Sequence, residues 1–310
     1  MTPTREVFAG IDVGGTTTQV VLVDELLRPI AHATTRTPAL EGGDAIVGAA
    51  SALIDSLLAH AQDTPPLTGI GMGSAGVVDT ENGRVSVVSD SFAGWAGFDI
   101  RGTLEARYDA PTTVANDVNA FLAGEMIAGA GRGSQNALGI TLGTGVGGAL
   151  WLDGRLFGGA HGAAGEIGHT PGFGSLPCTC GERGHLETLA AGRSISALYR
   201  SATGSSRTPA ELSALAADGD AVATHIFQAA GEGVARAILI ATALLDIETV
   251  VIGGGVSNAW PLLYPAIIRH LEKEPPVRGT APAIVRGTLG DSAVAQGAAA
   301  LSFAVERARP

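Results

Sequence analysis

Two strand–glycine–strand patterns, far apart in the chain, restrict the fold more than any other feature of the sequence. Residues 10–16 read Gly-Ile-Asp-Val-Gly-Gly-Thr, and residues 139–145 read Gly-Ile-Thr-Leu-Gly-Thr-Gly. A second apolar strand follows each copy, at 18–24 and at 149–154. A repeat at this separation predicts two related α/β domains facing one another, rather than a solenoid of many short units.

The remaining periodicity completes two domains. Apolar spacing predicts helices at 44–61, 221–245 and 291–305, and strands that end in loops at 69–79, 113–117 and 250–256. We place the domain boundary near Val118. Residues 1–118 would form a small N-terminal α/β domain and residues 119–290 a larger C-terminal one, with the last helix, about 291–310, packing back on the first domain.

Composition excludes several classes of protein. Hydrophobic residues make up 45% of the 310 residues and charged residues 16%, which is unlike a disordered chain. The sequence has no run of about 18 apolar residues and no signal-peptide pattern at its start, so we expect a cytoplasmic protein without a membrane partner. With 19 Lys and Arg against 30 Asp and Glu, and no basic cluster, nucleic acid is not an expected partner.

Three glycine-rich turns follow predicted strands, at Gly14-Gly15-Thr16, Gly143-Thr144-Gly145 and Gly253-Gly254-Gly255. One such turn can be a plain hairpin. Three together favour phosphate binding by backbone N–H groups and threonine hydroxyls, because glycine lets the backbone approach a ligand closely. None matches a P-loop, and no segment has the dinucleotide pattern G-x-G-x-x-G between a strand and a helix.

Two aspartates stand where these strands end. Asp12 precedes the first glycine turn, and its carboxylate can hold Mg²⁺ or merely cap the turn. Asp117 follows Asn116 where a strand passes into a helix. It can serve as a helix N-cap, or as the carboxylate that orients an attacking hydroxyl and takes its proton in phosphoryl transfer.

A group of metal-ligand residues lies in the middle of the chain. It consists of His169, Cys178, Cys180 and His185. Two nitrogens and two sulfurs suit a tetrahedral Zn²⁺. The C-x-C spacing is tighter than the usual C-x₂₋₄-C, so the alternative is two free cysteines and two surface histidines.

Taken together, these motifs resemble those of the ROK family, named for repressors, open reading frames and kinases. The resemblance rests on the order and spacing of Asp12-Val13-Gly14-Gly15-Thr16, Asn116-Asp117-Val118-Asn119 through Gly124-Glu125, Glu166-Ile167-Gly168-His169 and Cys178-x-Cys180-Gly181-x-x-Gly184-x-x-Glu187. It runs from Gly10 to about Gly297.

The resemblance implies an α/β, actin-like (ribonuclease H-like) fold of two domains that close over a central cleft. It also implies an ATP-dependent kinase that phosphorylates a hexose hydroxyl, O6 of glucose or of a related hexose, with ATP, Mg²⁺ and a structural Zn²⁺. The nucleotide would be held by Asp12, Gly14, Gly15, Thr16, Gly143, Thr144, Gly145, Gly254 and Gly255. The sugar would be held by Gly76, Asn116, Asp117, Glu166, His169 and Glu187, with Asp117 as general base and His169 shared with the zinc.

The chain departs from the family pattern at two places. His185 stands where the family usually has a third cysteine, and imidazole can replace it as a zinc ligand. Asp90, in Ser89-Asp90-Ser91, stands where glucokinase-like members tend to have asparagine. The resemblance places this loop near the sugar, so the identity of the hexose depends on it.

Several functions are weighed against the hexose kinase. An N-acetylmannosamine or N-acetylglucosamine kinase of the same family is the nearest alternative. A non-catalytic sugar-sensing module is disfavoured because Asp12, Asp117 and both phosphate loops are present. An ATPase with another substrate is disfavoured by Glu166, His169 and Glu187. A DNA-binding repressor is not expected, since the first phosphate loop begins at Asp12 and leaves no room for an N-terminal winged helix-turn-helix. The resemblance also suggests a homodimer.

Overall fold

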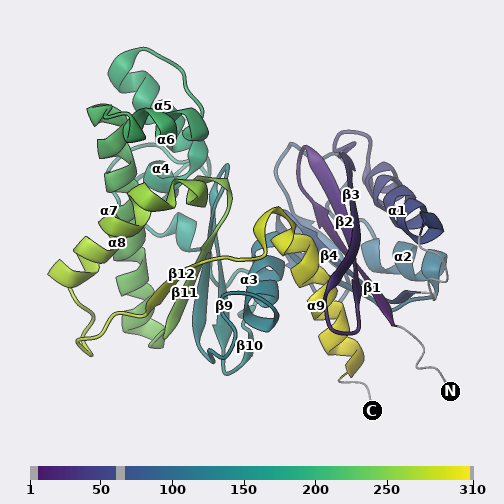
Figure 1. Cartoon of the computed structure of the whole chain (residues 1–310). Helices are drawn as coiled ribbons and strands as arrows, with labels where there is room; N and C mark the ends of the chain where they lie inside the picture. The colour runs from purple at the N-terminus through teal and green to yellow at the C-terminus, as the bar shows by residue number, and fades with distance from the viewer. Residues whose placement is uncertain (1–5, 61–66, 308–310) are drawn as a thin grey trace. The chain divides into compact units, whose positions relative to one another are not determined.

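A computed structural model describes residues 6–60 and 67–307, and the chain divides into two compact units (Figure 1). The first unit runs to Arg132 and takes in residues 158–164 and the chain from Thr288 onward, whereas the second holds residues 133–157 and 165–287. This division differs from the boundary predicted near Val118. The helix that begins at Asp117 belongs to the first unit, because it packs against the last helix of the chain.

Each unit is built around one five-stranded sheet. The first unit contains β1 (Val7–Val13), β2 (Thr17–Asp24), β3 (Pro29–Arg36), α1 (Gly43–His60), β4 (Leu67–Ser74), β5 (Val77–Asp79), β6 (Arg84–Val87), α2 (Ile100–Tyr108), β7 (Thr112–Asn116), α3 (Asp117–Ile127), the short 3₁₀ helix η3 (Gly290–Ser292) and α9 (Ala293–Arg307). The second contains β8 (Ala137–Leu142), β9 (Val146–Leu152), β10 (Arg155–Leu156), η1 (Ile167–His169), α4 (Glu187–Ala190), α5 (Gly192–Thr203), α6 (Pro209–Ala217), α7 (Ala221–Leu245), β11 (Thr249–Gly253), η2 (Gly255–Ala259), α8 (Trp260–Lys273) and β12 (Ala283–Arg286).

The two sheets have the same topology. Their strand orders are β3-β2-β1-β4-β7 and β10-β9-β8-β11-β12. In the first sheet β1 is antiparallel to β2 and parallel to β4, and in the second β8 is antiparallel to β9 and parallel to β11. The repeat seen in the sequence is therefore a repeat of architecture, as predicted.

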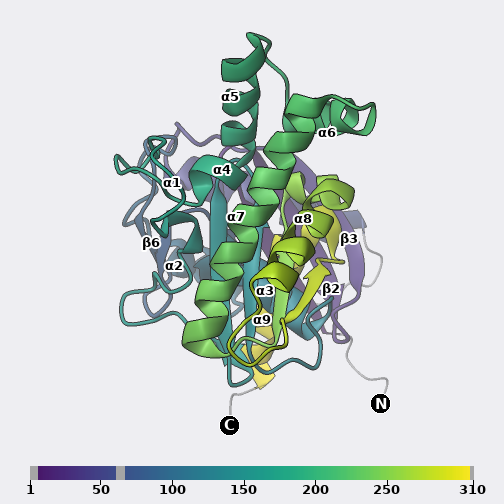
Figure 2. The same ribbon diagram turned by 90° about the vertical axis from the view of Figure 1, so that its left-hand side faces the viewer.

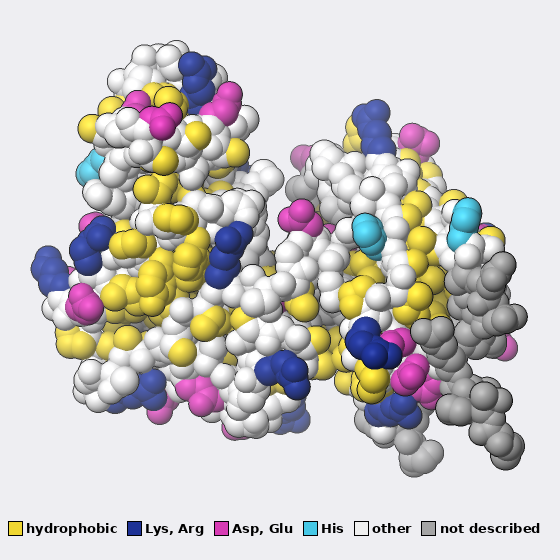
Figure 3. Space-filling view, in the orientation of Figure 1, with side chains coloured by type: hydrophobic (Ala, Val, Ile, Leu, Met, Phe, Trp, Pro, Cys, Tyr) yellow, Lys and Arg dark blue, Asp and Glu magenta, His cyan; other side chains and the backbone are white. Residues whose placement is uncertain are grey.

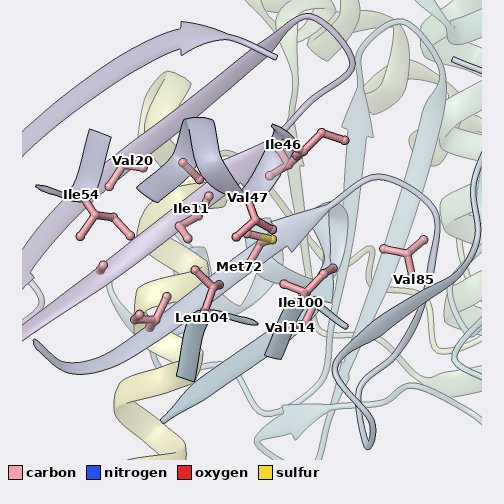
Figure 4. Close-up of a cluster of buried hydrophobic side chains, with 14 of the residues drawn as sticks. Ile11, Val20, Ile46, Val47, Ile54, Met72, Val85, Ile100, Leu104 and Val114 are labelled. Atoms are coloured by element: carbon pink, nitrogen blue, oxygen red, sulfur yellow. The ribbon is translucent and has the colours of Figure 1, made fainter. Parts of the chain in front are cut away.

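The sheet of the first unit is buried on both faces. Side chains on one face, including Ile11 of β1 and Met72 of β4, pack with Ile46 of α1 and Leu104 of α2 (Figure 4). On the other face Phe8 packs against α9. Because neighbouring side chains of a strand point to opposite faces, a strand buried on both reads as a continuous apolar run.

Glycine allows α9 to lie against this sheet. A β-carbon at Gly10 would overlap the carbonyl oxygen of Ala295, and one at Gly71 would overlap that of Ala298. The alanine-rich sequence of α9 keeps its own side of the contact small. Close approach at these positions explains glycine in two otherwise apolar strands.

In the second unit, α7 and α8 lie against one face of the sheet (Figure 2). Helix α7 is long and apolar enough to cross a membrane by length and composition, but half of its most apolar window is buried inside the protein. Glu232 and Arg236 interrupt its apolar sequence. A buried stripe that includes Val234 and Ile238 is what a core helix of this kind presents to its own domain.

Candidate active site

In the first unit, three parallel strands bring Asp12 and Asp117 to one edge of the sheet. Asp12 of β1 pairs with Gly73 of β4, and Ser74 of β4 pairs with Asn116, the last residue of β7. The carboxyl ends of parallel strands meet at the same edge, which is where ligands bind in open α/β sheets. The two carboxyl groups are close enough for Asp117 to perturb the ionisation of Asp12.

The ionisation of Asp12 is strongly perturbed. Burial, and to a smaller degree the negative charge of Asp117, raises the pKa of Asp12 from 3.8 to about 7. Near neutral pH this carboxyl group is therefore poised between its neutral and charged forms. A divalent cation beside it would favour the charged form, because a nearby positive charge stabilises a carboxylate.

The helix cap at this edge is Asn116 and not Asp117. The Asn116 side-chain oxygen accepts from the backbone N–H groups of Val118 and Asn119, at 2.9 and 3.2 Å. Asp117 is the first residue of α3, and its Oδ1 also accepts from Val118 N at 2.9 Å. The capping role that the sequence left open for Asp117 thus belongs to its neighbour.

Asn116 also fixes the loop at Gly76. Its Nδ2 donates to the Gly76 carbonyl oxygen at 2.9 Å. Gly76 has φ +101°, and a β-carbon there would overlap the Val87 carbonyl oxygen, so only glycine fits. The second N–H of this amide makes no hydrogen bond in the part of the chain that the structure describes, so it remains for a ligand.

The first glycine turn opens on a cavity. Gly14 N donates to Thr17 O at 3.0 Å and closes the turn, so Gly14 serves the hairpin itself. Gly15 and Thr16 are exposed and line a cavity of about 740 Å³ that Asp90 also lines. The structure therefore brings Asp90 to the same cavity as the predicted phosphate loop.

A second cavity, of about 900 Å³, lies within the second unit. Three of the residues predicted to bind nucleotide line it: Gly143, Thr144 and Gly255. Gly143 follows β8 and Gly255 follows β11, two parallel strands that pair side by side. Gly254 has φ +82° and lies against the backbone of Leu142, where a β-carbon would be 2.6 Å from the carbonyl oxygen. Gly254 is therefore needed for the conformation of the turn.

The rest of the lining was not predicted. It comes from α5, α6, the segment between them and η2, and consists of Gly192, Arg193, Ser196, Ser206, Arg207, Thr208, Pro209, Ala210, Glu211, Val256 and Asn258. Thr208, Pro209 and Glu211 form the capping box that begins α6, but no sequence motif marks these residues as a binding site. Only the presence of arginines in a chain of net charge −11 could have drawn attention to them.

The four predicted metal ligands come together in the second unit. Their ligand atoms all lie within 4.8 Å of one another. The Nδ1 atom of His169 is 3.8 Å from Cys178 Sγ, and that of His185 is 3.3 Å from Cys180 Sγ. A tetrahedral Zn²⁺ with ordinary Zn–S and Zn–N bonds separates a sulfur from a nitrogen by about 3.6 Å. The observed distances lie on either side of this value, so the set fits zinc.

A tight turn makes the C-x-C spacing workable. Cys178 N donates to Glu182 O at 2.8 Å, and Gly181 N donates to Cys178 O at 3.1 Å, with Gly181 at φ +97°. Burial, together with the charges of Glu187 and Cys180, raises the pKa of Cys178. Without a cation, then, the negatively charged thiolate form of Cys178 is disfavoured. A divalent cation beside it would stabilise that form.

Glu187 connects the loop that carries the predicted metal ligands to the second glycine turn. Its Oε2 accepts from Val146 N at 3.0 Å, and its Oε1 accepts from Thr179 Oγ1 at 3.1 Å and from Arg193. Burial by itself would raise the pKa of Glu187, but the hydrogen bond from Val146 and the charge of Arg193 outweigh it and lower that pKa. Glu187 is therefore a buried, ionised carboxylate.

Glu166 is the predicted site residue with the least support from its neighbours. Its backbone oxygen accepts from His169 N at 3.1 Å, at the start of η1. Its side chain is exposed and makes no hydrogen bond or ion pair within the described residues. The carboxylate is thus available to a ligand, but no hydrogen bond or ion pair among the described residues joins it to the rest of the predicted set.

Known proteins resemble this chain over nearly its whole length. Residues 8–304 match the ROK family. A glucokinase of Halalkalibacterium halodurans is 34% identical over 286 residues, which cover 86% of this chain and 85% of that protein. An N-acetylmannosamine kinase of Citrobacter koseri is also 34% identical, over 93% of this chain and 98% of that protein.

A solved structure agrees with the sequence comparison. The crystal structure of a ROK family glucokinase from Streptomyces griseus, in complex with glucose and AMPPNP, is 28% identical to this chain. It superposes with a TM-score of 0.80 over 96% of this chain and 99% of that one. The paired five-stranded sheets are those of the actin-like ATPase fold. The chain belongs to the ROK family.

Proposed function

We propose that this protein is an ATP-dependent hexose kinase that transfers the γ-phosphoryl group of ATP to a hexose hydroxyl, O6 of glucose or of a related hexose. The observation that carries the proposal is the pair of carboxyl groups at one sheet edge, with Asp12 raised to a pKa of about 7 beside Asp117. The protein's membership of the ROK family, and its similarity to a glucokinase and an N-acetylmannosamine kinase, support the same reaction.

Asp117 would act as the general base. A hexose hydroxyl is a poor nucleophile until its proton has an acceptor, and a carboxylate can both aim the oxygen and take the proton. Since Asn116 caps α3, Asp117 is not needed to begin that helix. Asp12 would hold Mg²⁺, which neutralises charge on the transferring phosphoryl group when it is bound.

Each unit would contribute its own set of ligand contacts. In the first, Gly15 and Thr16 would meet phosphate, while Gly76, Asn116 and Asp117 would meet sugar. In the second, the cavity lined by Gly143, Thr144 and Gly255 would hold nucleotide. Glu166, His169 and Glu187 would contact sugar hydroxyls. Gly14, Gly145 and Gly254 would shape the turns.

The cluster of His169, Cys178, Cys180 and His185 would hold a structural Zn²⁺. Because Nδ1 of His169 faces the cysteines, its Nε2 would remain for the sugar, with the metal fixing the tautomer. Binding energy from the metal would stabilise the loop that also carries Glu187.

We further infer a cytoplasmic homodimer that acts without nucleic acid or membrane. Apolar side chains gather on the surface of the second unit (Figure 3), and Ile240, Leu244 and Tyr264 of α7 and α8 are 41%, 77% and 37% exposed. Such a patch is typical of an interface between protein chains. Sedimentation velocity of wild type and Leu244→Glu tests it, and a monomeric wild type would contradict it.

Coupled ADP release with glucose, mannose, N-acetylglucosamine and N-acetylmannosamine tests the reaction. We expect release that depends on a hexose, and the highest kcat/KM identifies the substituent preferred at C2. Relatives of equal identity are named for glucose and N-acetylmannosamine, so the kinase for the latter is the second candidate. ADP release without sugar would instead indicate an ATPase, and sugar binding without ADP release a sensing module.

A further inference from the structure

Arg193 lies between the loop that carries the predicted metal ligands and the cavity of the second unit. It is the second residue of α5, and its guanidinium group contacts the loop that carries the metal ligands. Nη2 donates to Thr179 Oγ1 at 2.8 Å and to the buried carboxylate of Glu187. These two bonds account for both hydrogens of one amino group.

The same side chain also lines the 900 Å³ cavity together with Gly143 and Thr144. Its Nη2 lies 3.9 Å from where a β-carbon of Gly145 would stand, which places the guanidinium group beside the second glycine turn. Nε and Nη1 make no hydrogen bond within the described residues, so three N–H donors remain unused. The side chain is 39% exposed, which leaves these donors accessible.

We propose that Arg193 is a phosphate-binding residue that also positions Glu187. It would give Nε and Nη1 to phosphate oxygens of a nucleotide in the cavity, while Nη2 holds the Glu187 carboxylate. The inference rests on the proposed kinase function and adds to it a side chain outside the recognised motifs. A guanidinium group suits this double task because it is planar, permanently charged and able to form paired hydrogen bonds with phosphate.

The alternative is that Arg193 only neutralises Glu187. The two roles differ in what they predict for nucleotides with and without phosphate groups. A phosphate contact affects ADP and AMPPNP but not adenosine, whereas a purely structural ion pair affects none of them selectively. Calorimetric titration of adenosine, ADP and AMPPNP therefore separates the roles without relying on turnover.

The variants are Arg193→Met, which keeps an unbranched stem but no donors, and Arg193→Lys, which keeps charge without the planar fork. Arg200→Met is the matched control, since Arg200 is exposed on the same helix, does not line the cavity and makes no side-chain hydrogen bond in the structure. We expect Arg193→Met to weaken ADP and AMPPNP about tenfold and to leave adenosine within about twofold. Arg193→Lys should fall between it and wild type, which provides a result even if the methionine variant does not fold.

Wild-type affinity for ADP in both Arg193 variants would overturn the proposal, as would equal losses for ADP and adenosine. These outcomes differ from failure of the proposed function. If the wild-type protein binds ADP but phosphorylates no hexose, the proposed kinase function is wrong, whereas the proposed phosphate contact of Arg193 is unaffected. A wild-type protein that binds no nucleotide would overturn both.

Discussion

The shifted ionisation of Asp12 makes stability depend on pH in a direction opposite to that of most carboxylates. Its pKa rises from 3.8 to about 7, first because the group is buried and second because Asp117 is negatively charged. In that interval the native state keeps a proton that the unfolded chain has released. The free energy of unfolding therefore falls as pH rises from about 4 to about 7, and becomes flat above pH 7.

The perturbation that isolates this effect is Asp12→Asn, which keeps the size of the side chain and removes the titration. One proton retained by the native state corresponds to a slope of at most about 1.4 kcal/mol per pH unit. The stability of wild type relative to Asp12→Asn should thus decline by nearly this amount per unit between pH 5.5 and pH 6.5. Above pH 7.5 the difference should be constant.

Urea unfolding of both proteins at half-unit steps from pH 5.5 to pH 8.5 measures the slope. Carbon-13 NMR of aspartate carboxyl groups identifies its source, since one resonance that titrates near pH 7 should be absent from Asp12→Asn. In Asp117→Asn the same resonance should titrate at lower pH, although still above 3.8, because burial remains. Parallel stability curves, or no aspartate titrating above pH 6, would refute the reasoning.

Three further predictions concern the proposed site. Asp117→Asn should fold normally, because Asn116 supplies the cap, and should lose kcat by about 10²- to 10⁴-fold with little change in calorimetric sugar affinity; near-normal kcat would place the base elsewhere. His185→Ala should lower zinc content, measured by elemental analysis of chelator-free protein, and should weaken sugar binding more than ATP binding; unchanged zinc would contradict the ligand set. Glu166→Gln and Glu187→Gln should raise the KM for hexose more than that for ATP, with kcat/KM falling about 10- to 100-fold; equal effects on both KM values would mean that the side chains are misassigned.

The helices and strands were predictable because the spacing of apolar residues indicates them. Apolar residues recur with helical spacing over residues 221–245, and α7 has these same bounds. The strands β1 and β8 are recognisable because each is a mainly apolar run that stops at a glycine turn, after Val13 and after Leu142. The repeat followed from these two patterns, and identical strand order in the two sheets confirms it.

The sequence could not show which of two neighbouring polar side chains caps α3. Asn116 and Asp117 both have a short side chain that accepts from backbone N–H, and only the start of α3 shows which of them is the cap. The predicted boundary near Val118 differs from the division of the structure for a related reason. A strand end looks like the end of a domain, whereas the contact between α3 and α9 joins segments that are far apart in the sequence.

The cavity lining between α5 and α6 was missed because its residues owe their position to tertiary packing. Arg193 and Arg207 follow no periodic pattern, and an arginine on an exposed helix end is usually just solvated. The four predicted metal ligands could be picked out because cysteine and histidine are rare enough for their spacing to be informative. Even so, the sulfur–nitrogen distances that fit zinc, 3.8 Å from Cys178 to His169 and 3.3 Å from Cys180 to His185, depend on the turn at Gly181 and not on the spacing alone.

One geometric rule accounts for where the chemistry lies in each unit. In the first sheet the parallel strands β1, β4 and β7 end together, which gathers Asp12 and Asp117 although about a hundred residues separate them. In the second sheet β8 and β11 end together, which gathers the turns at Gly143 and Gly255 in the same way. The second unit differs in the long connection from β10 to β11, which carries the predicted metal ligands, Glu187 and the helices α5 and α6. A duplicated scaffold therefore fixes two equivalent sheet edges of the kind where open α/β sheets bind ligands, and the connections between strands determine which side chains each edge presents.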